Sequence, residues 1–359
     1  MNIVNAKQQG FSIVELMIAL VISIGTIGGL FSIYLKTRTT QELTEANSRI
    51  QESGRFAMEY LKRDIRMIGY RGCVSNTVPT TTVNSKGIPD TYNPLINELV
   101  AYTITDGWDT DTLFADQTSV TSRIKKGTDA IYIARMSSTS AQLSEKQSDS
   151  SANIKISSSD GVNFEKNEII YISDCVTADI FTITNNPSTN DGVITFAHAQ
   201  GTNKTNNLSK AYQNNANIAR YQANLYFIGD TGRKNKSGTT VYALYQTSVN
   251  FGSSTNKFDT QELIEGVENM KILYGEALDT GNVKYVRFDK AANTPNMQDV
   301  SSIQLGLLIS SQDEVRENST SQSYFIAQQE IKADTLNAVD DKRLRHAFNA
   351  TIKIRNRRL

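Results

Sequence analysis

An unbroken apolar run near the N-terminus constrains the fold of this chain more than any other feature. It covers residues 11–35, and Glu15 is the only charged residue in it. At roughly 1.5 Å per residue, a helix of this length can cross the hydrocarbon core of a bilayer. An acid at membrane depth indicates either a functional site or a signal anchor in which the dipole of the first helical turn favours a carboxylate.

The polar lead before this run contains one candidate processing site. A secretory signal has a shorter apolar core, which a small-x-small cleavage site follows. Here the small-residue junction is Gly10–Phe11, ahead of the run, so cleavage there would leave the apolar helix on the mature protein. Lys7 precedes the run, whereas Lys36 and Arg38 follow it, so the charge bias is slight. We expect the N-terminus to lie in the cytoplasm.

The stretch "GFSIVELMIAL" resembles the class III leader of type IV prepilins and of type II secretion pseudopilins. The resemblance rests on a short basic leader, the Gly10–Phe11 junction and a Glu four residues after the Phe, inside an apolar helix. It implies that a prepilin peptidase removes residues 1–10 and methylates the new amine of Phe11. It also implies that Glu15 pairs with the N-terminal amine of a neighbouring subunit, because a buried charge is tolerated when assembly supplies its partner.

Helical periodicity continues beyond the apolar run. Apolar residues recur there at separations of mostly three and four, and no proline interrupts residues 11–69, which predicts one helix roughly 80 Å long. The apolar positions are Leu43, Ala46, Ile50, Ala57, Leu61, Ile65 and Ile68. The predicted weak points are Gly25, Gly28, Gly29 and Gly54. The spacing of Gly25 and Gly29 fits a helix-packing motif and a locally loosened helix equally well.

After Gly72 the pattern changes to short alternating or apolar runs, which predicts antiparallel β-structure. The candidate strands are "DAIYIAR", "EIIYISDCV", "DIFTITN", "YQANLYFIG", "TVYALYQTSV", "NMKILYGEAL", "SIQLGLLISS" and "NATIKIR". A polar loop, residues 230–238, is expected to join the fourth and fifth of these in a hairpin. Two polar stretches, residues 137–153 and 185–192, are expected to be surface loops and are candidate subdomain boundaries.

The predicted fold is therefore α+β and pilin-like, with a long N-terminal helix packed on an antiparallel β-sheet domain. The expected divisions are a removable leader at 1–10, a transmembrane half-helix at 11–35, an amphipathic half-helix at 36–71, and a β-rich globular domain at 72–359. The globular domain is large enough to be divided into two subdomains.

Three further stretches resemble the PilW family of minor pilins, in order along the chain. They are "LKRDIRMIGYRGC", "ELIEGVENMKILYG" and "DKRLRHAFNATIKIRNR", whereas residues 74–170 contain no recognised motif. The family resemblance favours a disulfide between Cys73 and Cys175, the only two cysteines, in an oxidising periplasm. The alternative is two free, separately buried thiols.

Enzymatic and cofactor-binding classes find no support in the sequence. His198 and His346 are the only histidines and stand in unrelated contexts, and with two cysteines they make no convincing zinc spacing. The sequence has no nucleophile elbow, phosphate loop or dinucleotide fingerprint. The formal net charge is zero, with 37 basic and 37 acidic residues, so no overall field attracts nucleic acid or anionic lipid. We expect no enzyme activity, cofactor, metal or small-molecule substrate.

One acidic stretch is a candidate calcium loop. Asp106, Asp109, Asp111 and Asp116 surround the sole tryptophan, Trp108, in "DGWDTDTLFAD". Both the spacing and the terminal ligand depart from the calcium-loop pattern. A turn with solvated acids is the preferred interpretation.

The C-terminal tail is locally basic. Its cations are Lys342, Arg343, Arg345, Lys353, Arg355, Arg357 and Arg358. Ala350, Ile352 and Ile354 alternate with polar residues, as in a strand with one buried face and one wet face. We therefore expect the cations to form a solvated face that protects a sheet edge, rather than a DNA site, because the tail lacks interleaved aromatic residues.

The resemblance implies a non-enzymatic minor pilin that helps initiate type IV pilus assembly in a tip complex, supporting adhesion, twitching motility and DNA uptake. The expected partners are other minor pilins, the major pilin, a tip adhesin, the prepilin peptidase and the inner membrane; DNA is not expected. The chain should span the inner membrane once, with its C-terminal domain in the periplasm, and later join the pilus at the cell surface. The alternatives are a J-type minor pseudopilin of type II secretion and a DNA-binding or adhesive module displayed on the pilus.

Overall fold

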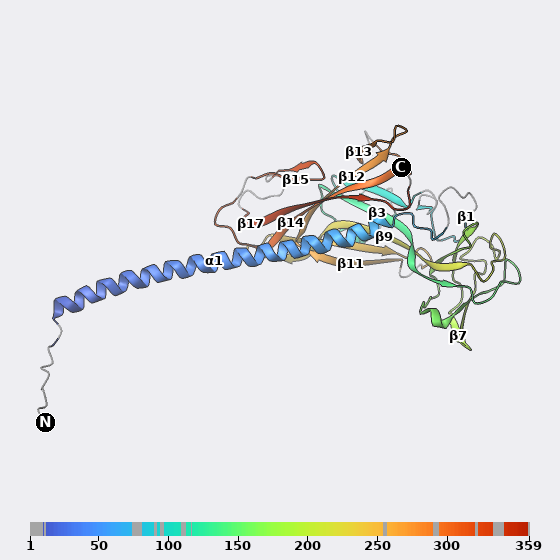
Figure 1. Cartoon of the computed structure of the whole chain (residues 1–359), viewed down its shortest axis with the longest axis horizontal. Helices are drawn as coiled ribbons and strands as arrows, with labels where there is room; N and C mark the ends of the chain where they lie inside the picture. The colour runs from blue at the N-terminus through green and yellow to red at the C-terminus, as the bar shows by residue number, and fades with distance from the viewer. Residues whose placement is uncertain are drawn as a thin grey trace, which may run out of the picture.

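A computed structural model shows one long helix carrying a β-rich head (Figure 1). The residues that it describes are 10, 12–73, 81–89, 92–93, 97–108, 113–115, 117–253, 257–289, 294–319, 322–332 and 341–357. The helix, α1 (Ile13–Arg66), projects from the head over its N-terminal half and packs along it over its C-terminal half. The predicted α+β class and the single continuous helix are confirmed.

Two large sheets make up most of the head. The order of the first along its main path is β1 (Thr81–Val83), β6 (Ala178–Thr182), β5 (Ile169–Ser173), β9 (Asn217–Lys234), β10 (Thr240–Val249) and β11 (Phe258–Glu265), with β3 (Thr128–Gln142) and β2 (Leu99–Ile104) branching from β9. The order of the second is β13 (Val283–Arg287), β12 (Val267–Ala277), β14 (Val300–Glu314) and β17 (Arg343–Lys353). Apart from the parallel pair β1 and β6, all these pairings are antiparallel.

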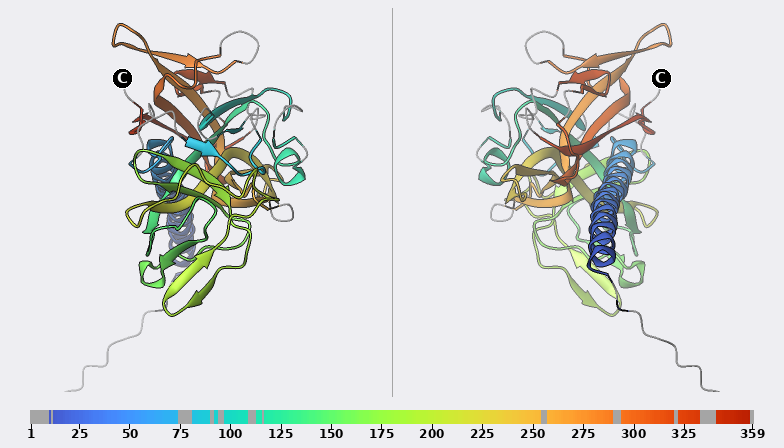
Figure 2. Two further views of the ribbon diagram at one scale, coloured as in Figure 1. Left: turned by 90° about the vertical axis from the view of Figure 1, so that its right-hand side faces the viewer. Right: turned by 90° about the vertical axis from the view of Figure 1, so that its left-hand side faces the viewer.

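Smaller elements complete the described head. They are the hairpin β15 (Tyr324–Ile326) and β16 (Gln329–Ile331), the sheet β4 (Ile154–Ser157), β8 (Val193–Phe196) and β7 (Ser188–Asn190), the short helix α2 (Thr118–Thr121) and the 3-10 turn η2 (Ser158–Asp160). Figure 1 places β1 and β7 at the end of the head furthest from the N-terminus. Figure 2 looks along α1 and shows the helix on one flank of the head.

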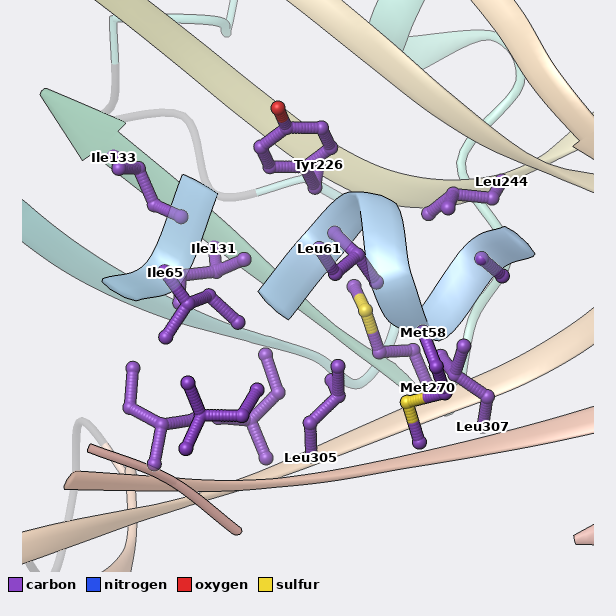
Figure 3. Packing of buried hydrophobic residues seen from close by; sticks show 14 of the residues in the cluster. Met58, Leu61, Ile65, Ile131, Ile133, Tyr226, Leu244, Met270, Leu305 and Leu307 are labelled. Carbon is purple, nitrogen blue, oxygen red and sulfur yellow. The ribbon is translucent and has the colours of Figure 1, made fainter. Parts of the chain in front are cut away.

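The C-terminal half of α1 packs between the two large sheets. Leu61 and Ile65 are fully buried, and their cluster includes Ile131 from β3 and Tyr226 from β9 on one side. Leu305 and other β14 side chains lie on the other side (Figure 3). Each such aliphatic side chain stabilises the fold by about 1.5 to 3 kcal/mol relative to exposure. The predicted apolar stripe is confirmed, although Leu43 at its start is only half-buried.

Gly54 differs from its predicted role as a weak point of the helix. It is buried against β17, and a Cβ atom at this position would overlap the ring of Phe348. A larger residue at this position would therefore have to displace the ring of Phe348. The helix also continues without a break through Gly25, Gly28 and Gly29, all of which are exposed.

All eight candidate strands fall on observed strands, but several boundaries are wrong. Residues 137–142, expected to be loop, extend β3 because Ala141 and its neighbours pair with β9. The expected hairpin loop at 230–238 is shorter because β9 continues to Lys234. There the Asn235 carboxamide oxygen accepts the backbone N–H groups of Ser237 (3.1 Å) and Thr239 (2.8 Å), which fixes the turn locally.

The segment between β3 and β9 builds a core of its own. Ile154, Phe164, Phe181 and Phe196 are among its buried apolar side chains, and these belong to a different cluster from the one around α1. Residues 185–192, expected to be a loop, contain the exposed strand β7 and the turn into β8. Of the hydrophobic clusters among the described residues, one therefore packs on the helix and another belongs to a distal part of the head built on the β4, β7 and β8 sheet.

Candidate assembly site

The start of α1 brings the predicted assembly residues to the tip of a projecting helix. Ser12 is the residue before the helix, and its carbonyl accepts the Leu16 N–H at 3.1 Å. Glu15 lies in the first turn and is exposed, with no hydrogen-bond or ion-pair partner among the described residues. Gly10 is also exposed, whereas Phe11 lies outside the described residues. The processing roles of Gly10 and Phe11 and the pairing role of Glu15 remain predictions.

The projecting half of α1 leaves its apolar surface uncovered. Fifteen large apolar side chains between Ile13 and Leu35 are exposed, from 46% at Leu35 to 80% at Ile13. The helix is long and apolar enough to cross a membrane by length and composition, and none of its most apolar stretch is buried in the structure. A continuous apolar surface of this size is unfavourable in water, so a lipid bilayer or other subunits must cover it.

A buried carboxylate fixes the other half of α1 to the head. Asp64 is only 4% exposed, and its Oδ1 accepts hydrogen bonds from Arg135 Nη2 at 2.6 Å and Nε at 2.9 Å. Its Oδ2 accepts hydrogen bonds from the Tyr226 hydroxyl at 2.6 Å and the Asn224 amide at 3.2 Å. Burial, followed by the charge of Asp64, raises the pKa of Tyr226. This network of four hydrogen bonds to one carboxylate joins the helix to β3 and β9.

The sequence did contain a signal for Asp64 that pattern reasoning missed. Asp64 lies three residues after Leu61 and four before Ile68, which places an acid on the apolar face of the helix. A carboxylate on a buried face needs a cation or several donors, because an unpaired buried charge is strongly unfavourable.

The C-terminal segment of the chain caps the end of α1. The backbone N–H of Arg355 donates to the Arg66 carbonyl at 3.1 Å, and the Asn356 amide donates to the Ile68 carbonyl at 3.2 Å. These contacts satisfy carbonyl groups that the helix end leaves without partners. The Arg357 guanidinium, 8% exposed as a residue, donates to the Val300 carbonyl at 3.0 Å and to Glu98 at 3.2 Å.

The prediction that the basic tail forms a solvated face is wrong for Arg343, Arg345 and Arg357, which are buried. On β17, Arg343 and Arg345 bind Glu268 of β12, each at 2.7 Å. Arg343 also binds Asp341 at 2.7 Å, and Arg345 forms an ion pair with the same carboxylate. These guanidinium groups are tolerated in the interior because two carboxylates neutralise them there.

The pKa values of both carboxyl groups in this cluster are lowered, as expected for carboxylates paired with arginines. Burial alone would raise the pKa of Glu268, but the hydrogen bond and charge of Arg345 hold that pKa below its usual range. Burial likewise opposes ionisation of Asp341, yet hydrogen bonds from Arg343 lower its pKa to about 2. The cluster is therefore ionised at neutral pH, and its arginines are not available to bind DNA.

The rest of the tail prediction holds in part. Ile352 and Ile354 are buried while Lys353 and Arg355 are exposed, so the alternation is confirmed. The strand that contains them, β17, is a terminal strand of its sheet, as expected. Arg358 lies outside the described residues.

The predicted disulfide is confirmed. The Cys73 and Cys175 sulfur atoms are 2.08 Å apart, and 102 residues separate the two positions in sequence. Cys175 lies in the turn between β5 and β6, not in a strand as expected, and has a φ of 73°. The Asp174 carboxylate accepts the Thr177 N–H at 2.9 Å and shapes this turn. The bridge ties the segment after α1 to the distal part of the head.

The histidines occupy unrelated environments. His198 is buried, and its Nε2 lies 3.0 Å from the Ala152 carbonyl beside the ring of Phe181. His346 is half-buried on β17. No group of three or more metal-binding side chains occurs among the residues that the structure describes.

The acidic stretch around Trp108 is described only in part. Asp106 is exposed in a bend, and Trp108 packs against Tyr102 and Phe114. The remaining candidate ligands, Asp109, Asp111 and Asp116, lie outside the described residues.

Comparison with known protein families finds matches in the N-terminal and C-terminal parts of the chain. The model of the PilW family, type IV pilus-assembly protein W, matches residues 225–356, and the prokaryotic N-terminal methylation motif matches residues 5–30. The chain carries a PilW-family region behind a prepilin methylation motif. The predicted resemblances to the PilW family and to a methylated prepilin leader are thereby confirmed over these residues. The PilW match begins within β9 and includes Glu268, Arg343 and Arg345.

One solved structure is also similar to part of this PilW-like chain. It is the type IV-like pilin TTHA1219 from Thermus thermophilus, at 18% identity over 38% of this chain and 78% of that one. The TM-score of this match is 0.20, so the pilin-like architecture rests on the helix and sheets described above. A comparison with curated protein sequences finds no significant match.

Proposed function

We propose that this chain is a non-enzymatic minor pilin that helps initiate pilus assembly in a tip complex with other minor pilins. The observation that carries the proposal is the division of α1 into two unlike halves. One half exposes a continuous apolar surface with a single carboxylate, and the other is fixed in the head. A subunit built this way needs a membrane or a helical filament core to cover its free half.

The carboxylate gives that association its specificity. Transferring an apolar helix from lipid tails to a bundle of other helices gains little hydrophobic free energy, because both surroundings are apolar. Polar contacts therefore decide which helices associate and in what register. After cleavage at Gly10–Phe11, the Glu15 carboxylate would meet the amine of a neighbouring subunit, and the pair would remove two costly unpaired charges.

The head is attached firmly to α1, as expected for a subunit whose helix determines where its head lies in the assembly. The Asp64 network, the cap formed by Arg355 and Asn356, and the Cys73–Cys175 bridge all act at or just after the C-terminal end of the helix. The register of the helix therefore sets the place of the head in the assembly. A disulfide also suits a head in the oxidising periplasm, which supports a cytoplasmic N-terminus and a single membrane crossing before assembly.

The test is deletion of the gene, followed by counting surface pili in cells with active retraction and in cells without it. Initiation predicts that pili disappear when retraction is active and reappear in part when it is blocked. Re-expression of the wild-type chain should restore the count. Normal piliation in both backgrounds would contradict a role in initiation.

A further inference from the structure

A groove opens where α1 first meets the head, and nothing in the proposed mechanism uses it. We propose that this groove binds an extended, basic segment of another pilus protein, which adds as a strand to the free edge of β11. The inference rests on the proposed function only in naming a pilus protein as the source of that segment. The groove itself is a property of this chain.

The shape of the groove fits an extended peptide. Its volume is about 850 Å³, and its walls are helix residues between Glu42 and Phe56, the end of β11 at 263–265, and the end of β14 with the residue after it, at 310–315. Leu263 and Ile264, which are half-buried, supply apolar surface, and Phe56 lines the groove with 54% of its surface exposed. An exposed aromatic ring beside apolar contacts is typical of an anchor point for a partner.

The backbone of β11 is available along this groove. The strand lies at the end of its sheet, and β10 is its one partner among the described strands. Among the described residues, no backbone hydrogen bond joins its outer edge to another segment. Gly266, at a φ of 86°, then leads the chain into β12 of the other sheet, and its carbonyl accepts the backbone N–H of Ser310 on β14 at 2.9 Å. A free edge beside a groove is a template for an added strand.

The charge of the groove selects a basic partner. Its acidic lining residues are Glu42, Glu45, Glu52, Glu265, Asp313 and Glu314. The lining contains two cations, and both are already engaged, Arg49 with Glu45 at 2.6 Å and Lys236 with Asp313 at 2.8 Å. Arg38 and Arg233, outside the lining, pair with two more of the acids. Glu52 and Glu314 have no ion pair among the described residues, so lysine or arginine on an incoming strand would find free carboxylates.

The position of the groove also suits a neighbour in the same assembly. It lies on the first part of α1 that contacts the head, next to the apolar half that other subunits must cover. A protein that packs on the projecting helix therefore reaches the groove without a long linker. The acidic residues on β11 could instead serve only to prevent edge-to-edge pairing between copies of this protein. The experiment below distinguishes this role from binding of a basic segment.

The test uses the full-length protein in detergent and fluorescence anisotropy of synthetic peptides of about eight residues, the length of a typical strand. One peptide alternates Lys with Val, a second alternates Glu with Val, and a third is the Lys peptide with a central proline. We expect the Lys peptide to bind about tenfold or more tightly than either of the others. Proline should weaken binding because it cannot complete the ladder of hydrogen bonds.

Two matched pairs of variants locate the site. Glu52→Lys and Phe56→Ser should each weaken binding of the Lys peptide about tenfold or more, because they remove a free carboxylate and the aromatic anchor. Glu59→Lys and Phe325→Ser change exposed residues of the same types outside the groove and should have little effect. All four positions are on the surface, and unchanged melting temperatures will show that the variants fold.

Several results would overturn the proposal. Equal affinity for the Lys and Glu peptides, equal losses in the groove and control variants, or no binding of the Lys peptide would each do so. Self-association that Glu52→Lys abolishes, without peptide binding, would show that a second copy occupies the edge instead. A failed peptide assay together with a loss of pili on gene deletion would reject this groove and leave the proposed function standing.

Discussion

Replacing Asp64, the buried carboxylate of α1, with alanine should strongly destabilise the packing of the helix on the head. The substitution removes the acceptor of four hydrogen bonds, two of them from Arg135. The Arg135 side chain is 14% exposed and would keep its charge without a partner. The Tyr226 hydroxyl, which is buried, would lose its acceptor as well.

The expected loss of unfolding free energy is about 3 to 5 kcal/mol, the usual cost of removing one partner from a buried ion pair. The free-energy cost of leaving the Tyr226 hydroxyl without an acceptor is not added in full, because groups in one hydrogen-bond network are not independent. Asp64→Asn keeps the shape and one acceptor oxygen, so it should cost less than alanine. In the double variant Asp64→Ala, Arg135→Met, part of the loss should return because no unpaired charge remains.

Urea unfolding of the full-length protein in detergent measures these differences. The emission of Trp108 reports the state of the head, because its ring packs against Tyr102 and Phe114. Glu59→Ala, an exposed change on the same helix, should stay within about 0.5 kcal/mol of wild type. If Asp64→Ala were no more harmful than Glu59→Ala, the account of how α1 is fixed to the head would be wrong.

Three further predictions concern covalent processing, the disulfide and acid stability. Intact-mass analysis of membrane protein should find a chain that begins at N-methylated Phe11, and a bulky residue at Gly10 should leave the leader attached. Cys73→Ser should lower abundance, and stability by up to about 4 to 5 kcal/mol, because it opens a loop that spans 102 residues; peptide mapping without reductant should find the bridge in wild type. The pKa of Asp341, about 2, lies below its unfolded value near 4, so its contribution of about 2 kcal/mol is complete above pH 4 and lost as the pH falls towards 2. Urea midpoints should show this loss in wild type and a flatter profile in Asp341→Asn.

The helix, the main strands and the disulfide could be predicted because their signals are local or come from a resemblance. The spacing of Leu61 and Ile65 needs only the helical period, and it placed the buried face correctly. The extension of β3 through a serine-rich stretch could not be predicted, because its pairing with β9 overrides weak strand propensity. Strand β11 was missed for a related reason, since its acids break the alternation that marks a half-buried strand.

The buried arginines show a second limit of prediction from local sequence patterns. Local alternation on β17 predicts a wet face, and the pattern is correct for Lys353 and Arg355. Arg343 and Arg345 depart from it because their partner, Glu268, is on β12, about 75 positions earlier in the sequence. Gly54 is similar, since the ring that a larger residue there would have to displace comes from Phe348 at the other end of the chain. Contacts of this range are decided by tertiary packing and leave no local pattern.

The substitution of Glu15 tests the central claim, that the carboxylate on the projecting helix pairs with a neighbouring subunit. Glu15→Ala should insert into the membrane at least as well as wild type, because an acid at membrane depth costs about 2.5 to 3.5 kcal/mol on insertion scales. Cleavage of the leader should continue. Glu15→Gln keeps the shape but loses the charge, so it should behave like alanine if electrostatic pairing dominates.

The decisive measurement is co-purification of other minor pilins with each Glu15 variant, together with the number of pili per cell, at wild-type protein levels. Pairing predicts that both quantities fall in Glu15→Ala and in Glu15→Gln, because the amine of the partner is left buried and unpaired. Normal co-purification and full piliation in both variants would contradict the account and would show that this subunit assembles through its head.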